Sequence, residues 1–117
     1  MSAEGRPDGV GKALSLLGIA RRAGVLLVGQ DQVFRAASRR KGLFVVTSED
    51  CSPNVMRKAL ALDGEKTTCR ALRGVGREEL GRHIGVLSAQ IAAIPADSGF
   101  AKKMALLLRQ EGSGIDE

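Results

Sequence analysis

Apolar positions recur along the chain in two patterns, one with a helical period and one typical of short buried strands. The helical pattern first appears over Lys12–Ala23, and a short apolar run over Val25–Val28 follows it between two glycines. Further helices are expected from Gly29 to the basic run Arg39–Lys41, and at Pro53–Leu62, Arg77–Ile84 and Ser98–Gln110; further strands are expected at Leu43–Thr47, Thr67–Leu72 and Gln90–Ile94. This alternation predicts an α/β fold, a three-layer α/β/α sandwich around a roughly four-stranded mixed sheet.

Signals at the ends of these segments support the assignment. Ser52 before Pro53 is typical of a helix start, and Gly85 suits a helix end. Glu49 and Asp50 follow the central strand, and we interpret this acidic pair as capping or loop-ordering residues rather than catalytic carboxylates.

The length of 117 residues fits one domain. We expect a flexible segment at residues 1–11, a folded domain at 12–110 and a disordered tail at 111–117, since both ends are rich in glycine and charge. No apolar run approaches a membrane span, and residues 1–11 do not resemble a signal peptide. Cys51 and Cys69 lack metal-ligand spacing, so we expect reduced thiols, a cytoplasmic location, and neither a metal nor a cofactor.

Charge is unevenly distributed along the chain. Residues 12–58 carry nine basic and three acidic side chains, whereas residues 59–117 carry eight of each. A basic half beside a neutral one indicates a surface for a polyanion, most commonly nucleic acid. The chain has three Phe and no Trp or Tyr, which argues against a sheet that stacks bases on exposed aromatics.

The stretch Gly24–Lys41 is the strongest local candidate for such a surface. A glycine leads into a helix with a polar first turn, and free backbone N–H groups at such a start attract phosphate. An ordinary strand–helix unit with a solvated basic end is the alternative interpretation of the same pattern.

Several short motifs occur in one order along the chain: Leu17–Gly24, Gly29, Val33 with Ala36 and Ala37, Glu49 and Asp50 with Pro53, Leu80 and Gly81 with Gly85, and Gly99–Lys103. With these motifs the chain resembles the kink-turn RNA-binding ribosomal-protein family (L-seven-Ae-like), and more closely its small bacterial YlxQ-like members. The chain also resembles the second half of proteins that carry a YlxR-like domain upstream. The resemblance covers about Lys12 to Arg109.

This resemblance implies a non-catalytic RNA-binding protein and suggests the residues that contact RNA. The family's Gly-x-Asn-Glu-x-x-Lys motif, which touches the sheared G·A pairs of the kink, corresponds here to Gly29–Arg35, with Asp31 and Gln32 in place of the Asn-Glu pair. The second contact loop corresponds to Val86–Ala89. The expected RNA-binding residues are Gly29, Gln30, Asp31, Gln32, Arg35, Arg39, Arg77, Val86, Leu87 and Ser88.

Leu87 allows two interpretations, a base-contacting side chain or a plug of the hydrophobic core. The expected partner is structured RNA, such as ribosomal or another kink-containing RNA, with ribosome or ribonucleoprotein proteins as further partners and with neither a membrane nor a small-molecule substrate. A protein-interaction scaffold on the same fold is the alternative function. An RNA-modifying enzyme ranks third, because the chain shows no cofactor motif.

Overall fold

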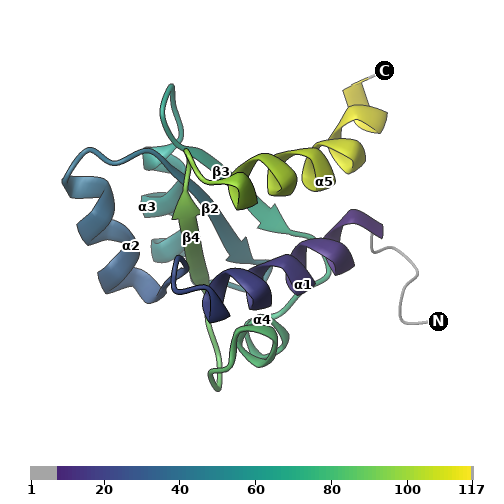
Figure 1. Ribbon diagram of the computed structural model, residues 1–117, viewed down its shortest axis with the longest axis horizontal. Coiled ribbons are helices and arrows are strands. Elements are labelled where there is room, and N and C mark those ends of the chain that lie inside the picture. The colour runs from purple at the N-terminus through teal and green to yellow at the C-terminus, as the bar shows by residue number, and fades with distance from the viewer. Residues whose placement is uncertain (1–7, 117) are drawn as a thin grey trace.

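The computed structural model describes residues 8–116, in which five helices alternate with four strands (Figure 1). In chain order these are α1 (Asp8–Arg22), β1 (Leu27–Val28), α2 (Gly29–Ser38), β2 (Leu43–Ser48), α3 (Pro53–Leu62), β3 (Thr68–Leu72), α4 (Arg77–Ile84), β4 (Ile91–Pro95) and α5 (Gly99–Asp116). The alternation confirms the predicted α/β fold class.

The four strands form one mixed sheet in the order β1-β4-β2-β3. β2 and β3 are parallel, whereas β4 runs antiparallel to both β1 and β2. β1, β2 and β3 therefore end at the same edge of the sheet, where β4 begins. β3 is an edge strand, as its polar sequence predicts.

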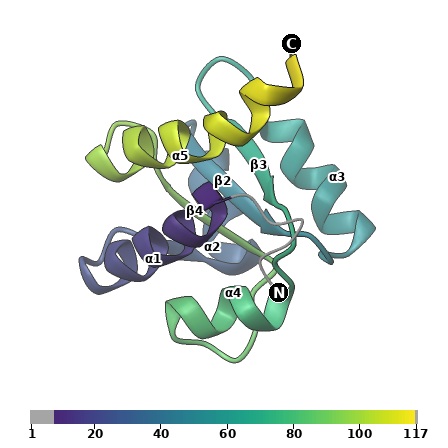
Figure 2. The same ribbon diagram turned by 90° about the vertical axis from the view of Figure 1, so that its right-hand side faces the viewer.

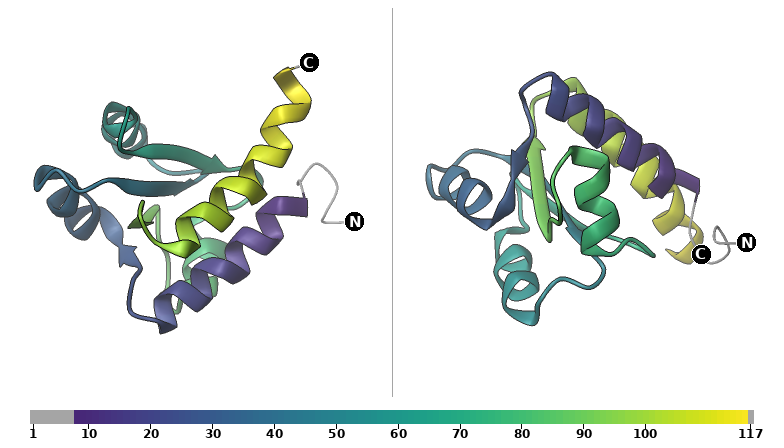
Figure 3. Two further views of the ribbon diagram at one scale, coloured as in Figure 1. Left: turned by 45° about the horizontal axis from the view of Figure 1, so that its top comes forward. Right: turned by 90° about the horizontal axis from the view of Figure 1, so that it is seen from below.

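Helices cover both faces of the sheet (Figures 1 and 2). On one face, α1, α4 and α5 pack over Phe44 and Val46; on the other, α2 and α3 pack over Leu43 and Val45. Figure 3 shows α1 and α5 side by side on the first face. All six residues of β2 are buried because this central strand is covered on both sides.

Apart from the end of α2, three boundaries differ by more than one residue from the sequence-based expectation. α1 begins at Asp8, inside the segment expected to be flexible, and residues 1–7 lie outside the described part of the chain. β1 is only two residues long, because the Val25 N–H donates to the Ala20 carbonyl (3.1 Å) and is drawn into the end of α1. α5 continues to Asp116, within the segment assigned to a tail.

The basic run after α2 lies outside the helix. Arg39 is the C-cap, and Arg40 takes the left-handed φ of +64° that is uncommon for a side chain other than glycine. The N–H groups of Arg39 and Arg40 donate to the carbonyls of Ala36 and Ala37, which tightens the last turn. The chain thus turns sharply before it enters β2.

Two side chains bond to the backbone of the edge strand β3 at Cys69. The Asp63 Oδ1 atom accepts a hydrogen bond from the Cys69 N–H (2.9 Å), and Arg70 Nη1 donates to the Cys69 carbonyl (2.9 Å). Both backbone groups of Cys69 are therefore paired within its own chain.

Candidate functional site

Three helix starts and one loop meet at the sheet edge where β1, β2 and β3 end. The register places Val28 opposite Ala92 and Thr47 opposite Ile91, so the starts of α2 and α3 lie near the chain that enters β4. β3 ends beside β2 and leads through a short loop into α4. Each of these helix starts carries a partial positive charge, which Asp31 offsets in part at α2, as Asp50, Glu78 and Glu79 do at α4.

The start of α2 has no side-chain cap on its first-turn N–H groups. Val28 is the N-cap residue and has no side chain that accepts a hydrogen bond, and Gly29 takes a φ of +89°. The Gln32 Oε1 atom instead accepts from the Val28 N–H at 3.0 Å. This contact was not predicted from the sequence. Because it occupies the Gln32 oxygen, the amide NH₂ group of Gln32 is left to donate to a ligand.

The polar face of α2 continues from this start. Gln30, Asp31, Gln32 and Arg35 are exposed, and Arg39 is exposed at the other end of the helix. Within residues 8–116 the side chains of Arg35 and Arg39 make no hydrogen bond or ion pair. Two cations are thus available to a ligand on this face, beside one carboxylate at Asp31.

The acidic pair after β2 orders the neighbouring loops. The Glu49 Oε1 atom accepts from the Gly74 N–H (2.9 Å), and Asp50 Oδ1 accepts from the Arg77 N–H (2.9 Å). Asp50 therefore caps the start of α4, which confirms the interpretation of the pair as capping and loop-ordering residues.

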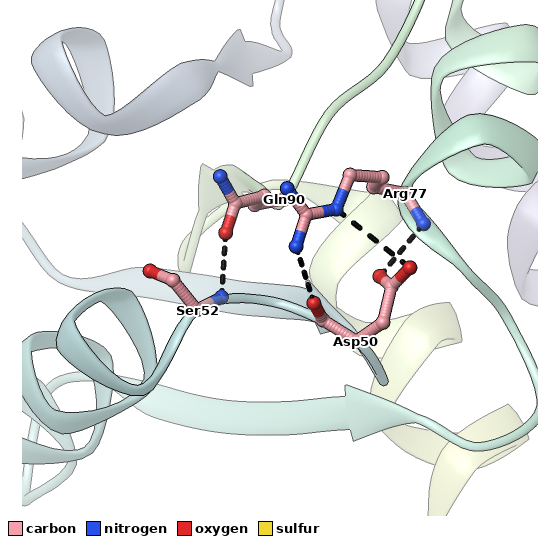
Figure 4. Close-up of polar contacts among 4 residues, drawn as sticks. All are labelled: Asp50, Ser52, Arg77 and Gln90. Atoms are coloured by element: carbon pink, nitrogen blue, oxygen red, sulfur yellow. Dashed lines mark hydrogen bonds and ion pairs between the residues drawn. The ribbon is translucent and has the colours of Figure 1, made fainter.

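Asp50 also holds the Arg77 side chain, as Figure 4 shows. Arg77 Nη2 donates to the Asp50 carbonyl (2.6 Å), and Arg77 Nε lies 3.7 Å from Asp50 Oδ2. Desolvation acts to raise the pKa of Asp50, but its hydrogen bonds and the Arg77 charge bring it below the ordinary value. The guanidinium is thereby fixed at the sheet edge, with part of its charge offset by Asp50.

A second contact joins the start of α3 to the start of β4 (Figure 4). The Ser52 N–H donates to Gln90 Oε1 at 2.6 Å, and the Ser52 Oγ atom caps α3 by accepting from the Val55 N–H (3.2 Å). Sequence reasoning predicted the cap but missed Gln90, because nothing local to the sequence links two residues 38 positions apart.

The loop Val86–Ala89 is held rigidly against α4. The Val86 N–H donates to the Gly81 carbonyl (2.8 Å), and the Ala89 N–H donates to the Arg77 carbonyl (3.0 Å). A Cβ at Gly81 would lie 2.6 Å from Ser88 Cα, so only glycine allows this approach.

Leu87 projects from this rigid loop into solvent. Its side chain is 94% exposed, whereas Val86 is half-buried and Ser88 is exposed. The structure therefore rules out the interpretation of Leu87 as a core plug. The loop thus leaves a large apolar side chain accessible near the point where three helices begin.

The structure brings most of the predicted site residues to one place. Gly29, Gln30, Asp31, Gln32, Arg77, Val86, Leu87 and Ser88 belong to the segments that meet at this edge, while Arg35 and Arg39 lie further along α2. Arg39 is the most distant of them, at the C-cap of the helix.

Neither His83 nor Cys69 belongs to a comparable cluster of polar side chains in the described part of the chain. His83 is exposed and its Nδ1 atom lies 3.1 Å from the Glu79 carbonyl of the same helix. Burial, with a smaller effect of Asp63, raises the pKa of the Cys69 thiol to about 11, and this thiol donates to the Ala59 carbonyl. Residues 8–116 contain no group of three side chains placed to hold a metal ion, and none of their helices is long and apolar enough to cross a membrane.

Comparison with known proteins identifies similar molecules. A model of the ribosomal protein L7Ae/L30e/S12e/Gadd45 family matches residues 11–105. A solved structure of a protein of unknown function from Bacillus halodurans is 33% identical, with a TM-score of 0.74 over 84% of this chain and 97% of that one. The Giardia lamblia 15.5kD RNA binding protein is 16% identical, with a TM-score of 0.67 over 86% of each chain. No curated protein sequence matches the chain.

Proposed function

Because this chain belongs to the ribosomal protein L7Ae/L30e/S12e/Gadd45 family, we propose that it binds structured RNA of the kink-turn type at the sheet edge described above. Membership of the family supports RNA binding in general. The observation that carries the finer proposal is the pairing of an uncapped α2 start with the exposed Leu87 on a rigid loop.

Each part of the edge suits a different part of a kinked RNA. The free N–H groups at Gly29 and Gln30 donate to phosphate or to base edges, and Arg35 donates to phosphate from the next turn of α2. Leu87 packs against an unstacked base, since apolar contact is sequence-tolerant and RNA is read mostly through unpaired bases.

Asp31 and Gln32 adjust how selective this contact is. Gln32 presents its NH₂ group, because its oxygen is bonded to the Val28 N–H. Asp31 places a negative charge at the RNA surface, although the same charge stabilises the helix start. The expected outcome is weaker discrimination in favour of sheared G·A pairs than an Asn at position 31 would give.

In this proposal the chain is a YlxQ-like protein, and its partner is ribosomal or ribosome-associated RNA. It binds this RNA in the cytoplasm and catalyses no reaction on it. The alternative is a protein-interaction scaffold with little RNA specificity.

Filter binding with two RNAs across a salt series separates these functions. One RNA contains a kink-turn, and the control is a straight duplex of the same length and composition. RNA recognition predicts tighter binding of the kinked RNA and a steep fall of affinity with salt, roughly 0.7–0.9 logarithmic units per tenfold salt for each phosphate contact. Equal, shallow binding of both RNAs would contradict the proposal and favour the scaffold.

A further inference from the structure

A cleft of about 600 Å³ lies between the second half of α2 and the other end of the sheet, where β2 begins and β4 ends. Its floor is apolar and is formed by Leu27, Leu43 and Pro95 with Ala36 above them. Leu43 is only 1% exposed, whereas Leu27, Ala36 and Pro95 are half-buried and leave apolar surface open to the cleft.

The rim of the cleft is strongly basic. Arg35, Arg39 and Lys41 line it together with Gln32, and Asp97 is the one carboxylate among the lining residues. The three cationic side chains are exposed, and none of them makes a hydrogen bond or ion pair with another residue of the described chain. The cleft thus combines an apolar floor with unpaired positive charge.

The turn after α2 places Lys41 on this rim. The Lys41 N–H lies 3.4 Å from the Ala36 carbonyl, and the left-handed Arg40 between Arg39 and Lys41 reverses the chain. The turn is fixed on its far side as well, since the Ala96 N–H donates to the Gly42 carbonyl (3.0 Å). Arg40 itself does not line the cleft.

We propose that this cleft holds an unpaired nucleotide of the same RNA, with its base against the apolar floor and its phosphates along Arg35, Arg39 and Lys41. The proposal rests on the proposed function, because the cleft continues the α2 surface through Gln32 and Arg35. Arg35 and Arg39 are four residues apart, about 6 Å along the helix axis, so they can follow a sugar–phosphate chain one nucleotide after another.

The chemistry of the lining favours a nucleotide. An apolar floor of aliphatic side chains can contact the face of a base without reading its edge, and unpaired arginines bind phosphate in a bidentate manner. The position of the rim beside an RNA surface gives a continuous path for one polyanion. An acidic peptide in the cleft would instead have to share Arg35 with the RNA bound at the start of α2.

The test compares a blunt kink-turn RNA with the same RNA extended by five unpaired uridines, attached at the 5′ or the 3′ end in separate samples. We expect one extended RNA to bind more tightly and to show a steeper salt dependence, by about 0.7 in the logarithmic slope for each added phosphate contact. Between 50 and 200 mM salt, one such contact corresponds to an additional loss of about 2.6-fold.

Lys41→Gln is the informative variant, because Lys41 lies outside the proposed kink-turn site. It should lower the logarithmic salt slope of the favoured extended RNA by about 0.7, which corresponds to one lost phosphate contact, and leave the blunt RNA unchanged. Lys12→Gln is the matched control, an exposed lysine on α1 at the other face of the sheet, and it should change neither RNA.

The outcomes separate this proposal from the proposed function. Equal affinity of blunt and extended RNAs would refute the cleft as a nucleotide site while leaving kink-turn binding intact. An equal loss for both RNAs in Lys41→Gln would also refute it, since Lys41 would then act on the duplex. Failure of wild-type protein to bind any of the RNAs would refute both proposals.

Discussion

Replacing Leu87 with alanine should separate RNA binding from stability. The side chain is 94% exposed, so only about one-twentieth of it is removed from water in the folded protein. Full burial of a leucine contributes roughly 1.5–3 kcal/mol, and the corresponding share here is about 0.1–0.2 kcal/mol. We therefore expect Leu87→Ala to shift the melting temperature by only about 1 °C.

The same variant should lose RNA affinity. If a base covers about half of the Leu87 side chain, truncation removes about 1 kcal/mol, which is a fivefold increase of Kd. Filter binding of kink-turn RNA at constant salt measures this change, and thermal unfolding followed by circular dichroism measures stability.

Leu106→Ala is the matched control, because Leu106 is an exposed leucine (59%) on α5, away from the proposed site. It should leave RNA binding unchanged. Wild-type affinity in Leu87→Ala, or a fall of melting temperature by more than about 5 °C with normal binding, would refute the role given to Leu87.

Four further outcomes are expected. Arg35→Ala should weaken kink-turn RNA binding by roughly 1–3 kcal/mol with little loss of stability, and wild-type binding at low and moderate salt would exclude it from the site. Asp31→Asn should tighten binding by removing a repelled charge and adding a donor; equal or weaker binding in the filter assay would show that the chain reads another RNA shape. Gly81→Ala should destabilise the fold by about 1–3 kcal/mol in urea unfolding, because its Cβ would meet the backbone of Ser88, and unchanged stability would disprove that contact. The pKa of Asp50 is lowered in the folded protein, so its charge stabilises the fold above the unfolded pKa, and this stabilisation is lost as the pH falls through the folded pKa. Asp50→Asn should remove this part of the pH dependence of stability, and the same dependence below pH 5 in the variant and the wild type would contradict it.

The sequence predicted the fold well because its periodic segments are locally consistent. The run Leu43–Thr47 could be assigned to a central strand since both of its faces are apolar, and Ser52-Pro53 marked the start of α3. β1 was predicted too long, since its first residue is captured by the Ala20 carbonyl at the end of α1. Backbone bonds of this kind leave no pattern in the side chains.

The sequence indicated which segments lie together at this end of the sheet but not the hydrogen bonds that join them. Topology and family resemblance indicated that the Gly29 turn and the Val86–Ala89 loop come together, and the register of β1 and β4 agrees with this. The bonds of Asp50 to Arg77 and of Gln90 to Ser52 join residues 27 and 38 positions apart, so no local rule reveals them. Leu87 remained ambiguous in the sequence because a loop leucine fits either burial or exposure.

The capped edge of β3 affects how the protein behaves at high concentration. An open edge strand offers a row of unpaired donors and acceptors to which another chain can add, the first step of sheet-mediated aggregation. Here Asp63 and Arg70 occupy both backbone groups of Cys69, the second of the five residues of β3. The other edge strand, β1, is too short to act as a template. The outer side of β3 therefore offers fewer free backbone groups to a second copy of the chain, which makes edge-to-edge pairing less favourable.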